Sequence, residues 1–173
     1  MQLIILGRDG VINKASQQGI NTPDDWDPIP GSLEAIARLN HAGYKVAVAT
    51  EQPGLRTGQL DLDALNSIHA RFHHLLSRVG GHVDAIFVCP HGPDDADNCE
   101  DSKSGLYQRI IERFSMPARV VPVVSNDLND LHAAKQIGSK PFLVGKAEGE
   151  ANPQYPAFKD LNHAVEHLLT KTP

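Results

Sequence analysis

The chain has 173 residues, 40% of them hydrophobic and 21% charged, which is the size and composition of a globular protein with a sizeable core. A formal net charge of −5 argues against the basic surface that nucleic acids or anionic membranes require. The apolar runs are too short to span a bilayer, the two cysteines are too few for a disulfide framework, and the first residues show no signal-peptide pattern. We therefore expect a cytoplasmic monomer without nucleic-acid or membrane partners.

Five short runs rich in Val and Ile predict β-strands that are buried on both faces, because apolar residues in them hardly alternate with polar ones. These runs are residues 3–6, 45–50, 83–89, 120–125 and 141–144. Helical patterns separate them, at residues 32–42, 61–79, 104–114, from Asn126 or Asp127 to Gly138, and 162–169. Strands that alternate with helices predict right-handed crossovers and a parallel sheet. We expect a three-layer αβα sandwich, formed as a single domain by residues 1–173.

In such a fold the ligand site lies at the carboxyl ends of the strands. Four of these ends carry polar side chains: Gly7-Arg8-Asp9, Thr50-Glu51-Gln52, Cys89-Pro90-His91 and Ser125-Asn126-Asp127.

These strand ends, in this order, resemble those of the haloacid-dehalogenase (HAD) superfamily of phosphotransferases. The closer resemblance is to the D-glycero-D-manno-heptose 1,7-bisphosphate phosphatases, which are related to the histidinol phosphatases. It covers nearly the whole chain and rests on the segments GRDGVIN, PIPGSLEAIARLNHAGYKVAVATEQPG, VDAIFVCPHGPDD, LNDLHAA and FLVGKAEGE. The resemblance implies a Rossmann-like HAD sheet with a small zinc-type loop instead of a large cap. It also implies a phosphatase that uses magnesium.

In this family an aspartate at the end of the first strand attacks phosphorus, and a second aspartate two residues later acts as acid and base. The resemblance places the nucleophile at Gly7 and the acid/base at Asp9. It places phosphate-binding groups at Thr50 and at a lysine position that is Asp101 here, with Lys103 two residues further on as the remaining candidate.

The resemblance also implies a magnesium site. Its ligands would be the nucleophile, the backbone carbonyl of Asp9 and an acid at Asn126, with Asp130 one helical turn later. Because Gly7 has no side chain and Asn126 offers only a neutral carbonyl, we expect magnesium binding to be weak or absent.

A zinc site is a further implication. Cys89, His91 and Cys99 resemble three of the four zinc ligands of the family loop, and the fourth position is Asp97. Zinc accepts thiolate, imidazole and carboxylate ligands in a tetrahedral arrangement. The alternative is a pair of unpaired cysteines beside a loop histidine.

The departures from the family pattern concentrate at the positions that would do the chemistry. Gly7 has no oxygen to attack phosphorus, and Glu51, Glu100 and Asp101 add negative charge where a phosphate would rest. The sequence therefore predicts a catalytically impaired relative, a pseudoenzyme that acts by binding a sugar phosphate or a protein partner.

Two alternatives stay open. One is an active, magnesium-dependent phosphatase of the heptose and lipopolysaccharide pathway, or an active phosphatase with a site rearranged around Asp9, Asp127 and Asp130. The other is a deliberately altered or decaying sequence without a present function. A simpler interpretation of Asp9 by itself is a loop cap that accepts hydrogen bonds from nearby backbone N–H groups.

Two further features have simpler interpretations. His69 and His73 have i, i+4 spacing but no evident third metal ligand, so we expect an exposed helix face. We expect Trp26 to pack a loop against the core.

Overall fold

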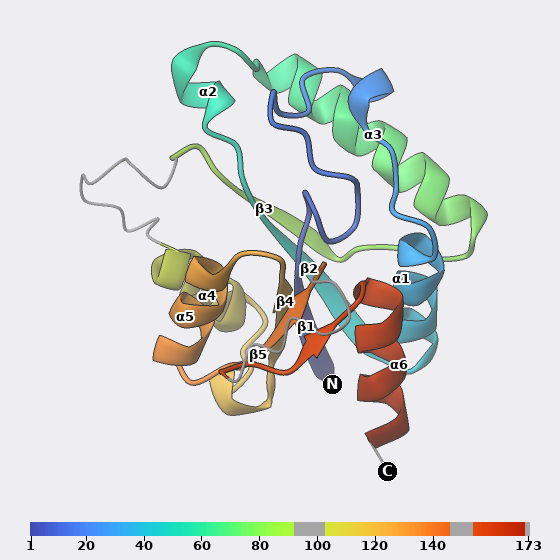
Figure 1. Ribbon diagram of the computed structural model, residues 1–173, viewed down its shortest axis with the longest axis vertical. Coiled ribbons are helices and arrows are strands. Elements are labelled where there is room, and N and C mark those ends of the chain that lie inside the picture. The colour runs from blue at the N-terminus through green and yellow to red at the C-terminus, as the bar shows by residue number, and fades with distance from the viewer. Residues whose placement is uncertain (92–102, 146–153, 172–173) are drawn as a thin grey trace.

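A computed structural model describes residues 1–91, 103–145 and 154–171, and shows a twisted parallel sheet between helices (Figure 1). All strand pairs are parallel, and the six strands lie in the order β3-β2-β1-β4-β5-β6. Their bounds are β1 Gln2–Gly7, β2 Tyr44–Glu51, β3 Ala85–Cys89, β4 Pro122–Ser125, β5 Lys140–Val144 and β6 Ala157–Phe158. The predicted parallel sheet is confirmed, and β1 lies inside it, between β2 and β4.

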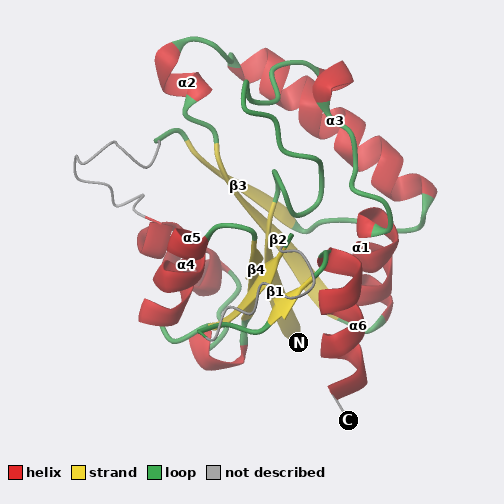
Figure 2. Ribbon diagram, viewed as in Figure 1, coloured by secondary structure: helices red, strands yellow, loops and turns green. Residues whose placement is uncertain are grey.

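Helices cover both faces of the sheet (Figure 2). Their bounds are α1 Ser32–His41, α2 Gly54–Thr57, α3 Leu62–Arg78, α4 Lys103–Arg113, α5 Leu128–Gln136 and α6 Leu161–Lys171, with short 3-10 helices at Pro23–Asp25 (η1) and Ala118–Val120 (η2). Helices α1, α3 and α6 share one hydrophobic cluster with the sheet, and α4 and α5 share a second one. None of the helices in the described ranges is long and apolar enough to cross a membrane.

The central strand β1 explains why both faces are covered. Ile4 and Leu6 point into the cluster under α1, α3 and α6, whereas Leu3 and Ile5 point into the cluster under α4 and α5. All four side chains are almost fully buried. A strand with apolar residues on both faces needs a helical layer on each side.

The helix ends follow from the local sequence. Asp61 begins α3 by accepting a hydrogen bond from the Ala64 backbone N–H at 2.7 Å, and Asp127 begins α5 by accepting one from Asn129 at 2.8 Å. Gly43 follows α1 with φ of +86°, a left-handed conformation that favours glycine. The predicted helix starts and stops are therefore confirmed to within a few residues.

Besides the 3-10 helices η1 and η2, the strand β6 and the helix α2 were not predicted. β6 has only two residues and pairs with the edge of β5, and α2 is a single four-residue turn after β2. Elements this short carry no hydrophobic period that a sequence pattern reveals.

Trp26 packs as expected. Its side chain is fully buried, and its ring lies 5.0 Å from that of Phe72 on α3. The Arg71 Nε also donates to the Trp26 carbonyl at 3.0 Å. These contacts hold the long loop between β1 and α1 against α3.

Candidate active site

The chain turns tightly after β1, at the carboxyl edge of the sheet. The Ile12 N–H donates to the Arg8 carbonyl at 2.8 Å, and the Gly10 N–H donates to the Asn13 carbonyl at 2.7 Å. Gly10 has φ of +80°, and a Cβ atom there would lie 2.1 Å from Asn126 Nδ2. A glycine at this position thus lets the turn approach the end of β4.

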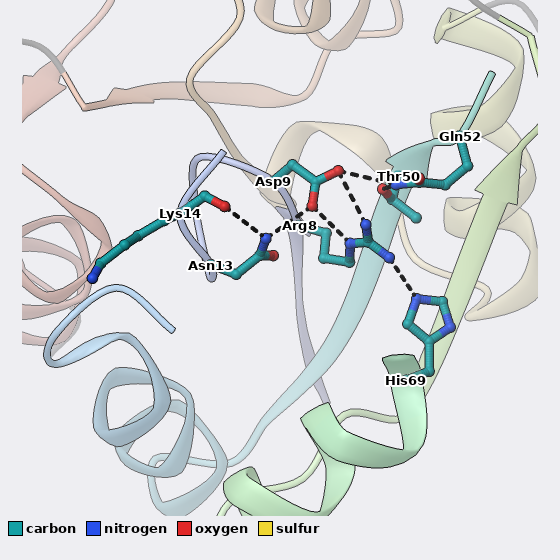
Figure 3. A network of polar contacts seen from close by, with 7 residues as sticks. All are labelled: Arg8, Asp9, Asn13, Lys14, Thr50, Gln52 and His69. Atoms are coloured by element: carbon teal, nitrogen blue, oxygen red, sulfur yellow. Dashed lines mark hydrogen bonds and ion pairs between the residues drawn. The ribbon is translucent and has the colours of Figure 1, made fainter. Parts of the chain in front are cut away.

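The turn holds the Asp9 carboxylate within a set of side-chain donors (Figure 3). Oδ1 accepts from Arg8 Nε at 2.9 Å and from Asn13 Nδ2 at 2.9 Å. Oδ2 accepts from Arg8 Nη2 at 3.1 Å and from Gln52 Nε2 at 3.0 Å. Asp9 is therefore held by side chains from its own turn and from the end of β2, rather than by the nearby backbone N–H groups expected of a loop-capping residue.

The Arg8 guanidinium is the buried cation of this network. Its side chain is fully buried, and its Nη1 lies 3.1 Å from His69 Nε2 on α3. Burial, followed by the charges of Arg8 and His73, lowers the pKa of His69 to about 4. The expectation of an exposed helix face is wrong for His69, because Arg8 reaches it across the core; His73 is exposed as expected.

Gly7 lies at the carboxyl end of β1, in register with Ala49 of β2. An added Cβ would lie 3.0 Å from Val11 Cγ2 and 3.6 Å from the Val124 carbonyl oxygen. The backbone at this position is thus open to a side chain once Val11 yields by a few tenths of an ångström. The chain carries no oxygen at the position that the resemblance assigns to the nucleophile.

Thr50, the first expected phosphate-binding residue, is buried at the end of β2. Its Oγ1 accepts from Gln52 Nε2 at 2.8 Å, which joins it to the Asp9 network. It lines a recess of about 20 Å³ together with Glu51, Tyr107 and Asp130. That volume accommodates about one water molecule. Lys103, the second candidate, is the first residue of α4, and its side chain lies outside the described residues.

The surroundings of this recess are acidic. Burial raises the pKa of Tyr107 well above its usual value, and the charges of Asp130, Glu51 and Asp127 raise it further. Three carboxylates thus act on one buried hydroxyl at the edge where the resemblance places the phosphate. Like charges repel strongly where they are shielded from water, so a phosphate dianion at this edge needs a cation or protons to offset these carboxylates.

The expected magnesium ligands do not fit that ion. Gly7 supplies no side chain, the Asn126 amide lies against the Gly10 turn, and Asp130 Oδ2 accepts from Ser125 Oγ at 2.8 Å. Magnesium requires hard, mostly anionic oxygen ligands in octahedral geometry. Within the described ranges no group of three or more His, Cys, Asp or Glu side chains is placed to hold a metal ion.

Two of the four expected zinc ligands, Cys89 and His91, lie within the described residues. Cys89 Sγ lies 3.9 Å from His91 Nδ1, directly after β3. Donors at 2.3 and about 2.05 Å from a tetrahedral ion lie roughly 3.6 Å apart, so this spacing fits two ligands of one zinc. The other two expected ligands, Asp97 and Cys99, lie outside the described residues.

The sequence places Arg8 and Gln52 at the carboxyl edge without giving them a role, and sequence reasoning missed Asn13 and the inward contact of His69. Only the tertiary fold brings Gln52 to Asp9 and His69 to Arg8, whereas Arg8 and Asn13 belong to the turn of Asp9 itself. A signal was available for Arg8 alone, since an arginine directly after a buried strand and before an acidic turn needs a buried partner.

Comparison with known proteins identifies the lineage. The chain is 48% identical over 149 residues to the D-glycero-beta-D-manno-heptose-1,7-bisphosphate 7-phosphatase of Bordetella bronchiseptica, covering 86% of this chain and 83% of the relative. It is 45% identical over 147 residues to the same-named enzyme of Pseudomonas aeruginosa, covering 85% of this chain and 83% of the relative. A search against family models gave no match.

Solved structures agree with these relatives. The D,D-heptose 1.7-bisphosphate phosphatase from B. bronchiseptica, complexed with magnesium and phosphate, superposes with a TM-score of 0.90 at 42% identity, over 99% of this chain and all of that one. The phosphatase from Burkholderia thailandensis superposes with a TM-score of 0.76 at 35% identity, over the same shares. An L-2-haloacid dehalogenase shares the fold at 15% identity, with a TM-score of 0.53. The chain therefore belongs to the heptose 1,7-bisphosphate 7-phosphatase family of the HAD superfamily.

Proposed function

We propose that this protein binds a phosphorylated sugar at the carboxyl edge of its sheet but is impaired in phosphoryl transfer. The substrate class is that of its relatives, which are named as heptose 1,7-bisphosphate 7-phosphatases. The impairment is carried by one observation, the glycine at the end of β1 where the family resemblance requires an attacking carboxylate.

Asp9 does not replace the missing group. Its four hydrogen bonds occupy both carboxylate oxygens, so attack on phosphorus would require breaking bonds to Arg8, Asn13 or Gln52. It also lies two residues beyond Gly7, in the turn that follows β1 rather than at the strand end. A displacement of even 1 Å can lower a reaction rate about a hundredfold.

A second candidate is favoured by the comparisons. The named relatives are phosphatases at 41–48% identity, and a solved relative binds magnesium and phosphate, which supports an active magnesium-dependent phosphatase more directly than an inactive one. In that case the acids near the recess, Asp9, Asp127 and Asp130, would have to replace the residues that differ.

Phosphate release from D-glycero-β-D-manno-heptose 1,7-bisphosphate with Mg²⁺ separates the two candidates. We expect no release by the unmodified chain above that of Gly7→Ala, which adds the Cβ atom without the carboxylate. Gly7→Asp should release phosphate at least tenfold faster than Gly7→Ala. The double variant Gly7→Asp with Asn126→Asp should release phosphate faster still, because Asn126→Asp adds a second anionic ligand for magnesium.

Turnover by the unmodified chain at ordinary enzyme rates, about 1–1,000 per second, would establish the second candidate. Asp9→Asn would then test the rearranged site, because an active site built on Asp9 should lose its activity.

We also propose that Cys89 and His91 bind zinc together with Asp97 and Cys99. The support is the 3.9 Å spacing of the Cys89 sulfur and the His91 ring nitrogen. Metal analysis of the purified protein should give about one zinc per chain, and Cys89→Ser should remove it. A zinc content that Cys89→Ser leaves unchanged would contradict this site.

A further inference from the structure

The Arg8 guanidinium is held from two sides. Its Nε and Nη2 donate to the two oxygens of Asp9, and its Nη1 lies 3.1 Å from Nε2 of His69, a residue 61 positions away in the sequence. Figure 3 shows the His69 imidazole on the side of the Arg8 guanidinium that faces away from Asp9. The Arg8 side chain is fully buried, so its N–H groups are shielded from bulk solvent.

The direction of the Arg8–His69 bond is fixed by chemistry. An arginine nitrogen only donates, so His69 Nε2 must accept, and the ring must be neutral with its proton on Nδ1. The low pKa of His69, about 4, agrees with a neutral ring. Figure 3 shows the second ring nitrogen pointing away from Arg8, on the side of β3.

The position of Asp9 therefore depends on α3. A guanidinium that is planar and chelates a carboxylate with two parallel N–H groups has one favourable orientation. If Nη1 lost its acceptor, the buried donor would have to rotate toward another oxygen, and the paired contacts with Asp9 would be lost with it.

We propose that His69 is a positioning residue, which holds Arg8 in register with Asp9 and so fixes the Asp9 carboxylate at the ligand edge. The inference rests on the proposed function only in taking Asp9 to act on the ligand. The hydrogen bonds themselves are present whether or not the chain releases phosphate.

The alternative is that His69 merely fills space between α3 and β1. Two variants separate these roles, because His69→Gln keeps an acceptor near the position of Nε2, whereas His69→Leu keeps bulk without an acceptor. His74→Leu is a matched control on the same helix, since His74 is exposed and lies outside the Asp9 network.

The first measurement is nitrogen-15 NMR of the full chain, which needs no turnover. We expect His69 to show the Nδ1–H tautomer and Arg8 Nε–H to exchange slowly with solvent. His69→Leu should speed this exchange at least tenfold, while His69→Gln and His74→Leu should leave it within about threefold of the unmodified chain.

An unchanged exchange rate in His69→Leu would overturn the proposal, and so would equal acceleration by His69→Gln, which would leave only a packing role. If His69→Leu does not fold, the tautomer in the unmodified chain decides, because a proton on Nε2 excludes the bond from Arg8.

The second measurement is kinetic, in whichever of the unmodified chain and Gly7→Asp releases phosphate. His69→Leu should lower kcat about 10–100-fold with KM changed less than about threefold, and His69→Gln should recover most of it. An unchanged kcat would overturn the positioning role. If neither the unmodified chain nor Gly7→Asp releases phosphate, Gly7→Asp has failed to restore activity. The hydrogen-exchange measurement then decides by itself whether His69 positions Arg8.

Discussion

The lone pairs of one carboxylate limit what the edge of the sheet can do. A carboxylate offers about four acceptor sites, and Asp9 uses four for Arg8, Asn13 and Gln52. The neighbouring position that would hold an attacking oxygen is Gly7. At the scale of single residues, the acid/base position is therefore built into the fold and the nucleophile position is not.

The titration of His69 tests the buried network at this scale. Its pKa is about 4, whereas an unfolded chain has a histidine pKa near 6.5. The unfolded chain thus binds more protons between these values, so the His69 contribution to stability is present above pH 6.5 and is lost as the pH falls toward 4. Because the ring is only half-buried, we expect a loss of about 1–2 kcal/mol.

Urea denaturation at pH 7 and pH 4.5 measures this loss. His69→Gln removes the titrating group, so the pH dependence of its unfolding free energy should be smaller than that of the unmodified chain. An NMR midpoint for the His69 ring near pH 6.5 would contradict the expected neutral, buried state.

The Gly10 turn gives a second residue-scale prediction. Gly10→Ala and Gly43→Ala both place a side chain at a positive φ, which costs about 1–2 kcal/mol. Only Gly10 has a neighbour in the way, since its Cβ would meet the Asn126 amide, whereas nothing lies within 4 Å of Gly43. We expect Gly10→Ala to lower the unfolding free energy by about 1 kcal/mol more than Gly43→Ala; equal losses would show that Asn126 moves away freely.

At the scale of elements, the ends of α3 and α5 decide where side chains reach the site. Asp61 caps α3, which carries His69 to Arg8, and Asp127 caps α5 beside Asn126. Both caps were predictable, because an Asp directly before an apolar helical period is a sequence signature of a helix start. The partner that α3 presents to Arg8 was not predictable, since no sequence period relates residues 61 positions apart.

The cap of α3 is testable by itself. Asp61→Ala removes the acceptor for the Ala64 N–H and should cost about 1 kcal/mol in unfolding free energy. Asp63→Ala, two residues later in the first turn, loses only an exposed, salt-screened interaction with the helix dipole and should cost about 0.3 kcal/mol. Equal costs in urea denaturation would contradict the capping role.

At the scale of the whole molecule, the fold was predictable and the site only in part. The strands are apolar on both faces, and the helices end at caps and glycines, so the parallel layered architecture follows from local patterns. We propose that the chain forms one domain around this sheet. The pairing of Gln52 with Asp9 and of Arg8 with His69 depends on strand and helix positions in space, which no local pattern encodes.

Family membership and chemistry are also separate at this scale. The 48% identity to a phosphatase over 86% of the chain and the TM-score of 0.90 against a solved relative fix the lineage and the fold. Activity depends on a handful of side chains, and function does not follow from fold. Gly7 and Asn126 stand where the family resemblance expects acids, on an otherwise well-formed scaffold.

The most direct test of the account is a search for a phosphorylated form of the protein. The unmodified chain and Gly7→Asp are each mixed with the heptose bisphosphate and Mg²⁺, quenched rapidly in acid and analysed by mass spectrometry. We predict no phosphoryl adduct on the unmodified chain and an adduct on residue 7 of Gly7→Asp. A phosphoryl group on any carboxylate of the unmodified chain would contradict the account.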